Sequence, residues 1–246
     1  MCRHLAYLGP PITLDALIIS QPWSLRRQSF EPRHQTHGRF NGDGFGVGWY
    51  AFERRREPAR FRTPTPMWAD RSFASIAGVV ASEAVLAAVR AASEGLPVEE
   101  SGNAPFVHGH WLFSLNGTVD GFLDGVGAAL RRTVRDEFLS TIQGVTDSEV
   151  LFAMALDLMD KGAKPADALD EVVGRVTRLT TARLNMLLTD GGEVTGTAFG
   201  NSLFARRTDD SVVVASEPYD DEPGWEPVPD NSIVEAAAGT VTVRPR

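Results

Sequence analysis

The only cysteine of this 246-residue chain is its second residue, directly after the initiator methionine. If Met1 is removed, which a small second residue permits, Cys2 carries both a thiol and a free α-amine. Reference pKa values are about 8.5 for the thiol and roughly 7.7–8.0 for the amine, so near neutral pH the amine can accept the thiol proton. The sequence therefore predicts a nucleophile that carries its own general base. The alternative is a chance cysteine near a frayed chain end, and position alone does not exclude it.

Three other positions could bind charge, and each also has a purely structural explanation. Asn116-Gly117 is the strongest short signal for a type I′ hairpin turn, yet an asparagine amide beside an unhindered glycine N–H also offers two donors to an oxyanion. Asp147 stands in the first turn of a predicted helix, where a carboxylate stabilises the helix dipole. Arg90 is the only charge in the apolar run 85–92, where an arginine usually holds a carboxylate. The local patterns leave these alternatives open.

Two of the five histidines, His108 and His110, are separated by one residue. On a strand they would share one face and supply half of a metal site. No third ligand is suggested by spacing, so we interpret them as surface or hydrogen-bonded histidines. No GxGxxG or Walker-type loop is present, which leaves a nucleotide cofactor unsupported. The sequence therefore predicts neither a metal nor another cofactor.

Composition excludes several classes of protein. The chain is 43% hydrophobic and 23% charged, as is usual for a soluble globular protein. Its net charge of −8 argues against nucleic acid or an anionic membrane as the main partner. No apolar stretch approaches the ~20 residues that span a bilayer, and no targeting segment is apparent. A single cysteine cannot form an internal disulfide, which fits a reducing cytoplasm. We expect a cytoplasmic protein; the sequence does not indicate its oligomeric state.

Strand patterns occur in both halves of the chain. They predict strands over 5–8, 45–52, 111–115, 184–189, 194–199, 211–215 and 240–243. In the second of these, glycines at 46 and 48 indicate that another backbone approaches closely. The run 85–92 fits a strand or a buried helix equally well. Residues 28–44 are expected to be irregular, and Arg54-Arg55-Arg56 to lie in a solvated loop.

Helix signals are concentrated in the middle of the chain. Thr146-Asp147-Ser148-Glu149 has the spacing of a capping box and predicts a helix that runs to about Lys161. Pro165 begins a second helix with an apolar face. Shorter helices are expected over 15–20 and 70–80. The whole pattern indicates a mixture of α and β without the regular alternation of a doubly wound parallel sheet.

In chain order, these residues and two further segments resemble the motifs of the class II glutamine amidotransferase domain, a group of N-terminal-nucleophile hydrolases. Each motif is weak by itself, but their order along residues 2 to about 219 is specific. The motifs are Cys2, Asn41-Gly42-Asp43-Gly44-Phe45-Gly46, Arg90-Ala91-Ala92-Ser93, Asn103-Ala104-Pro105-Phe106, Asn116-Gly117 and Thr146-Asp147-Ser148-Glu149. The chain departs from the family's common His-Asn-Gly form at Leu115. The resemblance implies one domain over 1–246, with an α+β fold in the form of a four-layer αββα sandwich.

The resemblance also implies a role for each matched residue. Cys2 would be the nucleophile and its α-amine the base, while Asn116 and Gly117 would hold the oxyanion. The substrate would be a small molecule with a γ-glutamyl group. Its α-carboxylate would bind Arg90 and Ser93, and its α-ammonium would bind Asp147. A guanidinium and a carboxylate set apart select such a zwitterion by opposite charges.

Further segments resemble the branch of this family that serves ergothioneine biosynthesis. They are Met1–Leu5, Leu86–Arg90, Gly109–Leu112, Ala215–Asp221 and Gly224-Trp225. This similarity implies an amidohydrolase that cuts glutamate from a γ-glutamyl conjugate of hercynylcysteine sulfoxide through a Cys2 thioester. The leaving part of that substrate carries a trimethylammonium group, which an aromatic face such as Trp68 or Trp225 would suit.

Two other functions fit the same motifs. The chain could be a glutaminase subunit that supplies ammonia to a partner synthase, because the motifs leave no room for a synthase domain of its own. It could also be a catalytically silent γ-glutamyl-binding domain. That third function predicts that Met1 is retained, since a blocked amine cannot act as a base.

Overall fold

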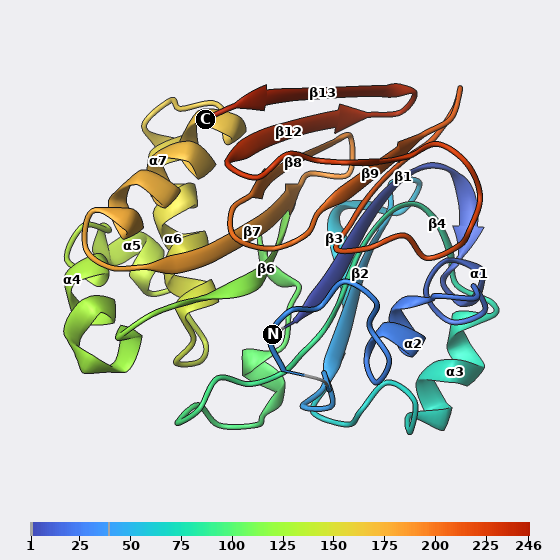
Figure 1. Cartoon of the computed structure of the whole chain (residues 1–246), viewed down its shortest axis with the longest axis horizontal. Coiled ribbons are helices and arrows are strands. Elements are labelled where there is room, and N and C mark those ends of the chain that lie inside the picture. Colours follow the sequence, from blue (N-terminus) through green and yellow to red (C-terminus); the bar gives the residue numbers. More distant parts are fainter. Residues whose placement is uncertain (1, 39) are drawn as a thin grey trace.

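Two antiparallel β-sheets face each other in this computed structural model, which describes residues 2–38 and 40–246. Helices cover the outer side of each sheet, with α1–α3 on one side and α4–α7 on the other (Figure 1). The predicted α+β, four-layer αββα arrangement is confirmed. Met1, whose removal the sequence predicts, lies outside the described residues. None of the helices in the described part of the chain is both long and apolar enough to cross a membrane.

The first sheet has the strand order β11-β9-β10-β1-β4-β2-β3. Its strands are β1 (Arg3–Thr13), β2 (Phe45–Ala51), β3 (Arg55–Thr63), β4 (Ala81–Val89), β9 (Phe204–Arg207), β10 (Val212–Ala215) and β11 (Trp225–Pro227). The outer face of this sheet packs against α1 (Leu14–Ile18), α2 (Leu25–Gln28) and α3 (Arg71–Ala77). The ambiguous run at 85–92 thus belongs mainly to a strand. The expected loop at Arg54–Arg56 is wrong in part, because Arg55 and Arg56 begin β3, although both side chains are exposed.

The second sheet has the strand order β13-β12-β8-β7-β6-β5. Its strands are β5 (Phe106–His108), β6 (Trp111–Val119), β7 (Ala182–Thr189), β8 (Glu193–Ala198), β12 (Ser232–Ala237) and β13 (Thr240–Pro245). On its outer face pack α4 (Gly127–Arg131), α5 (Asp136–Leu139), α6 (Asp147–Asp160) and α7 (Pro165–Thr177). Two short helical turns, η1 (Glu100–Gly102) and η2 (Phe122–Val126), lie in the connections.

Helix α6 begins where the capping pattern predicts. The Oγ1 atom of Thr146 accepts the N–H of Glu149 at 3.3 Å. The Glu149 carboxylate does not return to the N–H of Thr146, as a full capping box requires, but accepts the N–H groups of Gln143 at 2.7 Å and Gly144 at 2.9 Å. The acid therefore ties the preceding loop to the helix, and this fixes the first turn, which contains Asp147.

Asn116 and Gly117 lie in the middle of β6, where they pair with Asn185 and Leu184 of β7. The turn interpretation of this dipeptide is therefore wrong. A Cβ atom on Gly117 would stand 1.8 Å from the carbonyl oxygen of Arg183, so only glycine permits this pairing. The glycine serves the close approach of two strands, a use that an isolated Asn-Gly dipeptide does not reveal.

The glycines of β2 confirm in part the predicted close approach of another backbone. A Cβ atom on Gly46 would lie 2.3 Å from the carbonyl oxygen of Ala104, and one on Gly48 would lie 2.7 Å from the Leu112 side chain. The first neighbour is a backbone atom in the connection before β5 and the second is a side chain of β6, so the predicted approach of another backbone holds at Gly46 and not at Gly48. The two sheets thus meet closely at β2.

Candidate active site

A pocket opens at the start of β1, and five of the residues singled out in the sequence line it: Cys2, Arg90, Ser93, Gly117 and Asp147. In the pairing of β1 with β4, Arg3 stands opposite Val89. Cys2 and Arg90 therefore emerge side by side from the ends of two adjacent strands. Cys2 is half-buried, and its thiol donates to the carbonyl oxygen of Ala91 at 3.9 Å.

The buried guanidinium of Arg90 is held in place by the backbone around it. Its Nη1 donates to the carbonyl oxygen of Pro97 at 3.1 Å. Its flat face lies over Gly102, where an added Cβ would stand 2.7 Å from Cζ. The backbone N–H of Arg90 donates to Gly44 at 2.8 Å, and its carbonyl accepts from Asp43 at 3.0 Å. These contacts fix a cation at one side of the pocket.

Asp43 explains the place of the early glycine-rich motif in the site. Its Oδ2 accepts the N–H of Ala92 at 2.8 Å, so the segment that carries Ser93 is tied to the turn before β2. Gly44, at the end of this turn, has φ of +116°, which a residue with a side chain rarely adopts. The motif thus positions the Arg90–Ser93 segment without lining the pocket itself.

Asp147 places a buried carboxyl group in the same pocket. Its Oδ2 accepts the N–H of Val119 at 3.0 Å and its Oδ1 accepts the N–H of Ser148 at 2.8 Å. Burial raises the pKa of this carboxyl, although both hydrogen bonds and the charge of Arg90 oppose the rise. Across the described chain no cation forms an ion pair with Asp147. A ligand ammonium would supply the missing positive charge and favour the ionised form.

Asn116 does not line the pocket, although Gly117, the next residue of β6, does. The Asn116 side chain is fully buried, and its Nδ2 donates to the Oγ atom of Ser216 at 3.2 Å. Its backbone carbonyl accepts from the Asn201 side chain at 2.9 Å. The structure thus brings Gly117 to the pocket wall, whereas the amide of Asn116 stands beside it and is turned toward Ser216.

A buried polar group next to the pocket was not assigned a role from the sequence. His4 Nδ1 lies 3.1 Å from the Oγ atom of Ser114, and the His4 backbone N–H donates to Ser216 Oγ at 3.0 Å. Burial, aided by the charge of Arg3, lowers the pKa of His4 to about 3, so its ring is neutral at pH 7. One signal could have drawn attention to this group: Ser114 and Asn116 share one face of an otherwise apolar strand.

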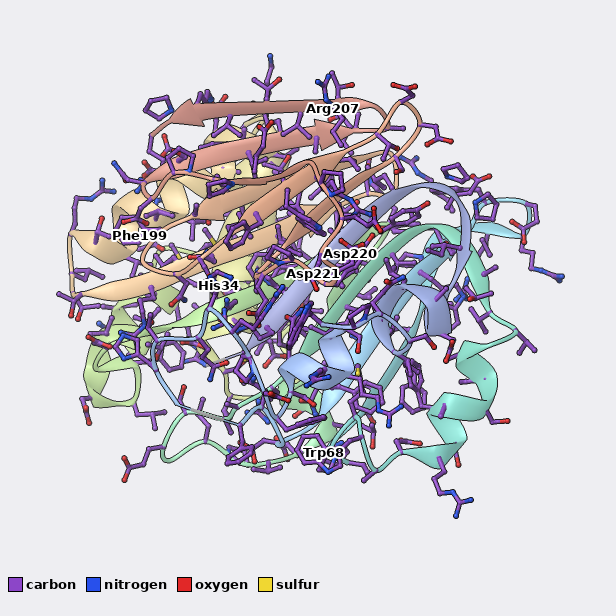
Figure 2. All side chains as sticks on the ribbon, turned by 45° about the vertical axis from the view of Figure 1, so that its right-hand side comes forward. His34, Trp68, Phe199, Arg207, Asp220 and Asp221 are labelled. Atoms are coloured by element: carbon purple, nitrogen blue, oxygen red, sulfur yellow. The ribbon has the colours of Figure 1, made fainter. Side chains whose placement is uncertain are left out.

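Neither tryptophan proposed for a cationic leaving group lines the pocket. Trp225 packs edge-on against Tyr219, and its Nε1 donates to Asp220 at 2.8 Å. Trp68 is 41% exposed, packs edge-on against Phe30 and covers Gly42 of the early motif. Figure 2 shows Trp68 at the lower rim of the molecule and Asp220 near its middle, so the two tryptophans belong to different places.

The two closely spaced histidines lie apart from this pocket. His108 ends β5 and faces the ring of Phe138, and His110 packs beside Trp111. Within residues 2–38 and 40–246, no three histidine, cysteine, aspartate or glutamate side chains gather in a metal-binding arrangement.

Comparison with known proteins agrees with this geometry. Residues 21–220 match the family model of the class II glutamine amidotransferases. The γ-glutamyl-hercynylcysteine sulfoxide hydrolase of Mycolicibacterium smegmatis is 40% identical over 246 residues, which is the full length of both chains. The enzyme of the same name from Mycobacterium tuberculosis H37Rv is 40% identical over 99% of this chain and 96% of its own.

Comparison of the fold with solved structures points to the same family. A glutamine aminotransferase class-II domain protein from Silicibacter pomeroyi superposes with a TM-score of 0.72 at 26% identity, over 99% of each chain. The family model and the full-length relatives each cover most of the sequence, and the two-sheet fold agrees with them. This chain belongs to the class II glutamine amidotransferase family.

Proposed function

We propose that this chain is an N-terminal-cysteine amidohydrolase that cleaves the γ-glutamyl amide of γ-glutamyl hercynylcysteine sulfoxide, which releases glutamate and hercynylcysteine sulfoxide for ergothioneine biosynthesis. One observation carries the proposal: Cys2, Arg90 and Asp147 line a single pocket in a chain that is 40% identical, from end to end, to hydrolases of that name. The alignment over the whole of both chains supports one catalytic domain over 1–246. A free nucleophilic thiol also fits the proposed reducing cytoplasm.

The charges of the pocket suit a glutamyl head group. The guanidinium of Arg90 would bind the α-carboxylate, with the hydroxyl of Ser93 as a further donor. The carboxylate of Asp147 would bind the α-ammonium. A substrate that lacks either charge would leave a buried ion unpaired, and such a loss typically costs about 2–5 kcal/mol. The pocket would therefore select the γ-glutamyl group, and selection of the leaving amine would come from contacts outside it.

In the proposed mechanism, the α-amine of Cys2 takes the thiol proton and the thiolate attacks the γ-carbonyl carbon. The N–H of Gly117 and the side-chain amide of Asn116 stabilise the oxyanion, and loss of one such donor costs about 2.7–4 kcal/mol in the barrier. The α-ammonium then gives its proton to the leaving amine as the C–N bond breaks. A water molecule attacks the thioester, its proton passes to the α-amine, and glutamate leaves with the thiol restored.

The family name also supports a second candidate, a glutaminase subunit that supplies ammonia to a partner synthase. Kinetics with the purified chain separates the two. We expect kcat/KM for the sulfoxide conjugate to exceed that for glutamine by at least about 10²-fold, because the leaving group adds binding energy in the transition state. A preference for glutamine, with a rate raised by added cell extract, would favour the glutaminase.

Intact-protein mass spectrometry tests the third candidate, a silent binding domain. We expect the mature chain to begin at Cys2, because the α-amine is the proposed base. The same instrument should detect a γ-glutamyl thioester on protein that is quenched in acid during turnover. Retention of Met1 on the whole population would contradict the enzymatic proposal.

We propose Trp68 as the aromatic contact for the trimethylammonium group, since it is exposed and covers Gly42 beside the turn that holds the Arg90–Ser93 segment. A cation over a tryptophan face contributes about 0.5–2 kcal/mol. Trp68→Ala should therefore lower kcat/KM on the sulfoxide conjugate by roughly 2- to 30-fold and leave glutamine turnover unchanged. Phe52→Ala, at another exposed aromatic residue, is the matched control. An equal loss on both substrates would exclude this role.

A further inference from the structure

We propose that Ser216 is a positioning residue that aims the side-chain amide of Asn116 at the substrate, because its hydroxyl oxygen joins that amide to the strand that carries the nucleophile. The proposal rests on the proposed function of Asn116 as an oxyanion donor. Ser216 does not line the pocket with Cys2, so it would act through Asn116 and not by touching the reacting atoms.

The hydroxyl oxygen of Ser216 accepts two hydrogen bonds from opposite sheets. The backbone N–H of His4, in β1 of the first sheet, donates to it at 3.0 Å. The Nδ2 atom of Asn116, in β6 of the second sheet, donates at 3.2 Å. All three residues are fully buried. One atom thus sets the position of the amide relative to a residue only two positions after Cys2.

The backbone pairing at this point explains why the hydroxyl is available. Strands β1 and β10 pair regularly from Leu8 opposite Val212 to Leu5 opposite Ala215. One step further, the N–H of Ser216 still donates to the His4 carbonyl at 2.9 Å. The return bond from His4 goes to the Ser216 hydroxyl, and the Ser216 carbonyl instead accepts from the hydroxyl of Ser202 at 2.8 Å. The side chain therefore replaces the backbone acceptor in the last pair before the nucleophile.

The loop that contains Asn201 and Ser202 forms hydrogen bonds with the backbone on both sides of this hydroxyl. Asn201 donates to the carbonyl of Asn116 at 2.9 Å, and Ser202 donates to that of Ser216. Asn185, which pairs with Asn116 across the strands, holds the loop by accepting the N–H groups of Phe199 and Asn201. Since the backbone is held in this way, the main remaining freedom of Asn116 is the rotation of its side chain, and the Ser216 hydroxyl restrains it.

The number of N–H donors on the Asn116 amide shows what this restraint would achieve. A primary amide has two N–H donors, and Ser216 takes one of them, which leaves the second for an oxyanion. The oxyanion forms only after the thiolate attacks. A misdirected donor therefore reduces the stabilisation of the transition state and leaves substrate binding unchanged. Removal of the hydroxyl should therefore lower kcat and leave KM nearly unchanged.

The test is a double-mutant cycle with Ser216→Ala, Asn116→Ala and the double variant, assayed on the sulfoxide conjugate. We expect Ser216→Ala to lower kcat by about 10-fold, a part of the roughly 10²–10³-fold loss expected when the donor itself is removed. In the Asn116→Ala background the Ser216 substitution should have no further effect, because there is no amide left to aim. Ser216→Thr keeps the hydroxyl and should restore most of the rate.

Two more variants separate positioning from folding. Ser114→Ala removes the neighbouring inter-sheet contact of His4 without touching the Asn116 amide, so it should lower the unfolding temperature and leave kcat unchanged. If Ser216→Ala does not fold, Ser216→Cys keeps the shape with a weaker acceptor and should lower kcat about 3-fold at unchanged KM. An unchanged kcat in folded Ser216→Ala or Ser216→Cys, or an equal loss with and without Asn116, would overturn the positioning role. Wild-type activity of Asn116→Ala would instead overturn the proposed oxyanion site itself.

Discussion

The space between the two sheets has two different ends. At one end Leu86, Leu112 and Leu187 belong to a cluster of buried hydrophobic residues, in which the hydroxyl of Tyr50 donates to the Thr189 carbonyl at 2.9 Å. At the other, where β1 begins, His4 and Asn116 are equally buried but form hydrogen bonds between the sheets. Strands β1, β4 and β6 contribute to both ends, so the difference lies in a few side chains and not in the backbone.

The comparison shows that the stability of the fold and the orientation of the buried polar side chains come from different interactions. Apolar burial is non-directional and contributes roughly in proportion to the area removed from water. Buried polar groups are expensive to desolvate, but once they are paired they specify one orientation. We therefore expect substitutions at the apolar end to change the free energy of unfolding, and loss of the hydrogen bond between Ser216 and Asn116 at the polar end to change catalysis.

The largest effect is expected from Cys2→Ser. The hydroxyl is a much weaker acid than the thiol, so the α-amine cannot generate a comparable nucleophile, and kcat should fall by at least about 10³-fold. The unfolding temperature should stay within about 2 °C, because Cys2 is half-buried and its thiol makes one long hydrogen bond. Steady-state kinetics measures the fall in kcat, and differential scanning calorimetry measures the unfolding temperature. Full turnover by the serine variant would end the proposed mechanism.

At the apolar end, Leu112→Ala should lower the free energy of unfolding by about 2–5 kcal/mol, the usual cost of a cavity in a packed core. Its side chain fills the space beside Gly48, where no Cβ could fit. Below the unfolding transition, kcat should remain within about 2-fold of the wild type, since the pocket lies at the other end. Urea unfolding and kinetics at the same temperature test this. A large loss of kcat in the folded variant would show that the two ends are coupled.

His4→Gln should change how stability depends on pH. The folded-state pKa of His4 is about 3 and the unfolded value is about 6.5, so between them only the unfolded chain binds the proton. The contribution of neutral His4 is thus present above the unfolded pKa and is lost as pH falls toward the folded one, by about 1.4 kcal/mol per pH unit.

From pH 7 to 4.5 the wild type should therefore lose about 2–3 kcal/mol more stability than the glutamine variant. Urea unfolding of both proteins at the two pH values measures this difference. Parallel losses would mean that the buried imidazole gains its proton without unfolding.

The smallest effect is expected from Gly102→Ala. The new Cβ would stand 2.7 Å from Cζ of Arg90, so the guanidinium must move away from its position in the pocket. Because that group is proposed to bind the substrate in the ground state and the transition state alike, KM should rise by about 10-fold with kcat nearly unchanged. Gly78→Ala, where a Cβ would meet open space, is the matched control. An unchanged KM would argue against Arg90 as the carboxylate-binding residue.

Local signals in the sequence predicted local structure well. The start of α6 follows from Thr146 and Glu149, which are three residues apart and bond to each other. The close approach of another backbone at Gly46 followed from the spacing of the glycines in β2. The predictions that failed concern pairing: Arg55 and Arg56 look like a loop, yet they join β3 because β2 offers a partner strand.

The residues of the candidate site also divide into those that the sequence indicated and those that it did not. The resemblance pointed to Cys2, Arg90, Ser93, Asn116, Gly117 and Asp147, and the fold brings all of them except Asn116 to the wall of one pocket. It gave no reason to expect a function for Ser216 beyond its place in a matched segment. A buried serine just after the end of a strand has no local signature, because what matters is the group with which it forms a hydrogen bond.

The sequence by itself determined the chemistry available to this protein: one thiol on the second residue, which would also carry the α-amine once Met1 is removed, a helix start that carries a carboxylate, and an ordered series of family motifs. Only the tertiary structure decided that Asn116-Gly117 is a strand and not a turn, and that Ser216 joins the amide to β1. The reason is distance along the chain. The contacts of Ser216 with His4 and Asn116 span 212 and 100 residues, and no local propensity specifies a hydrogen bond of that range.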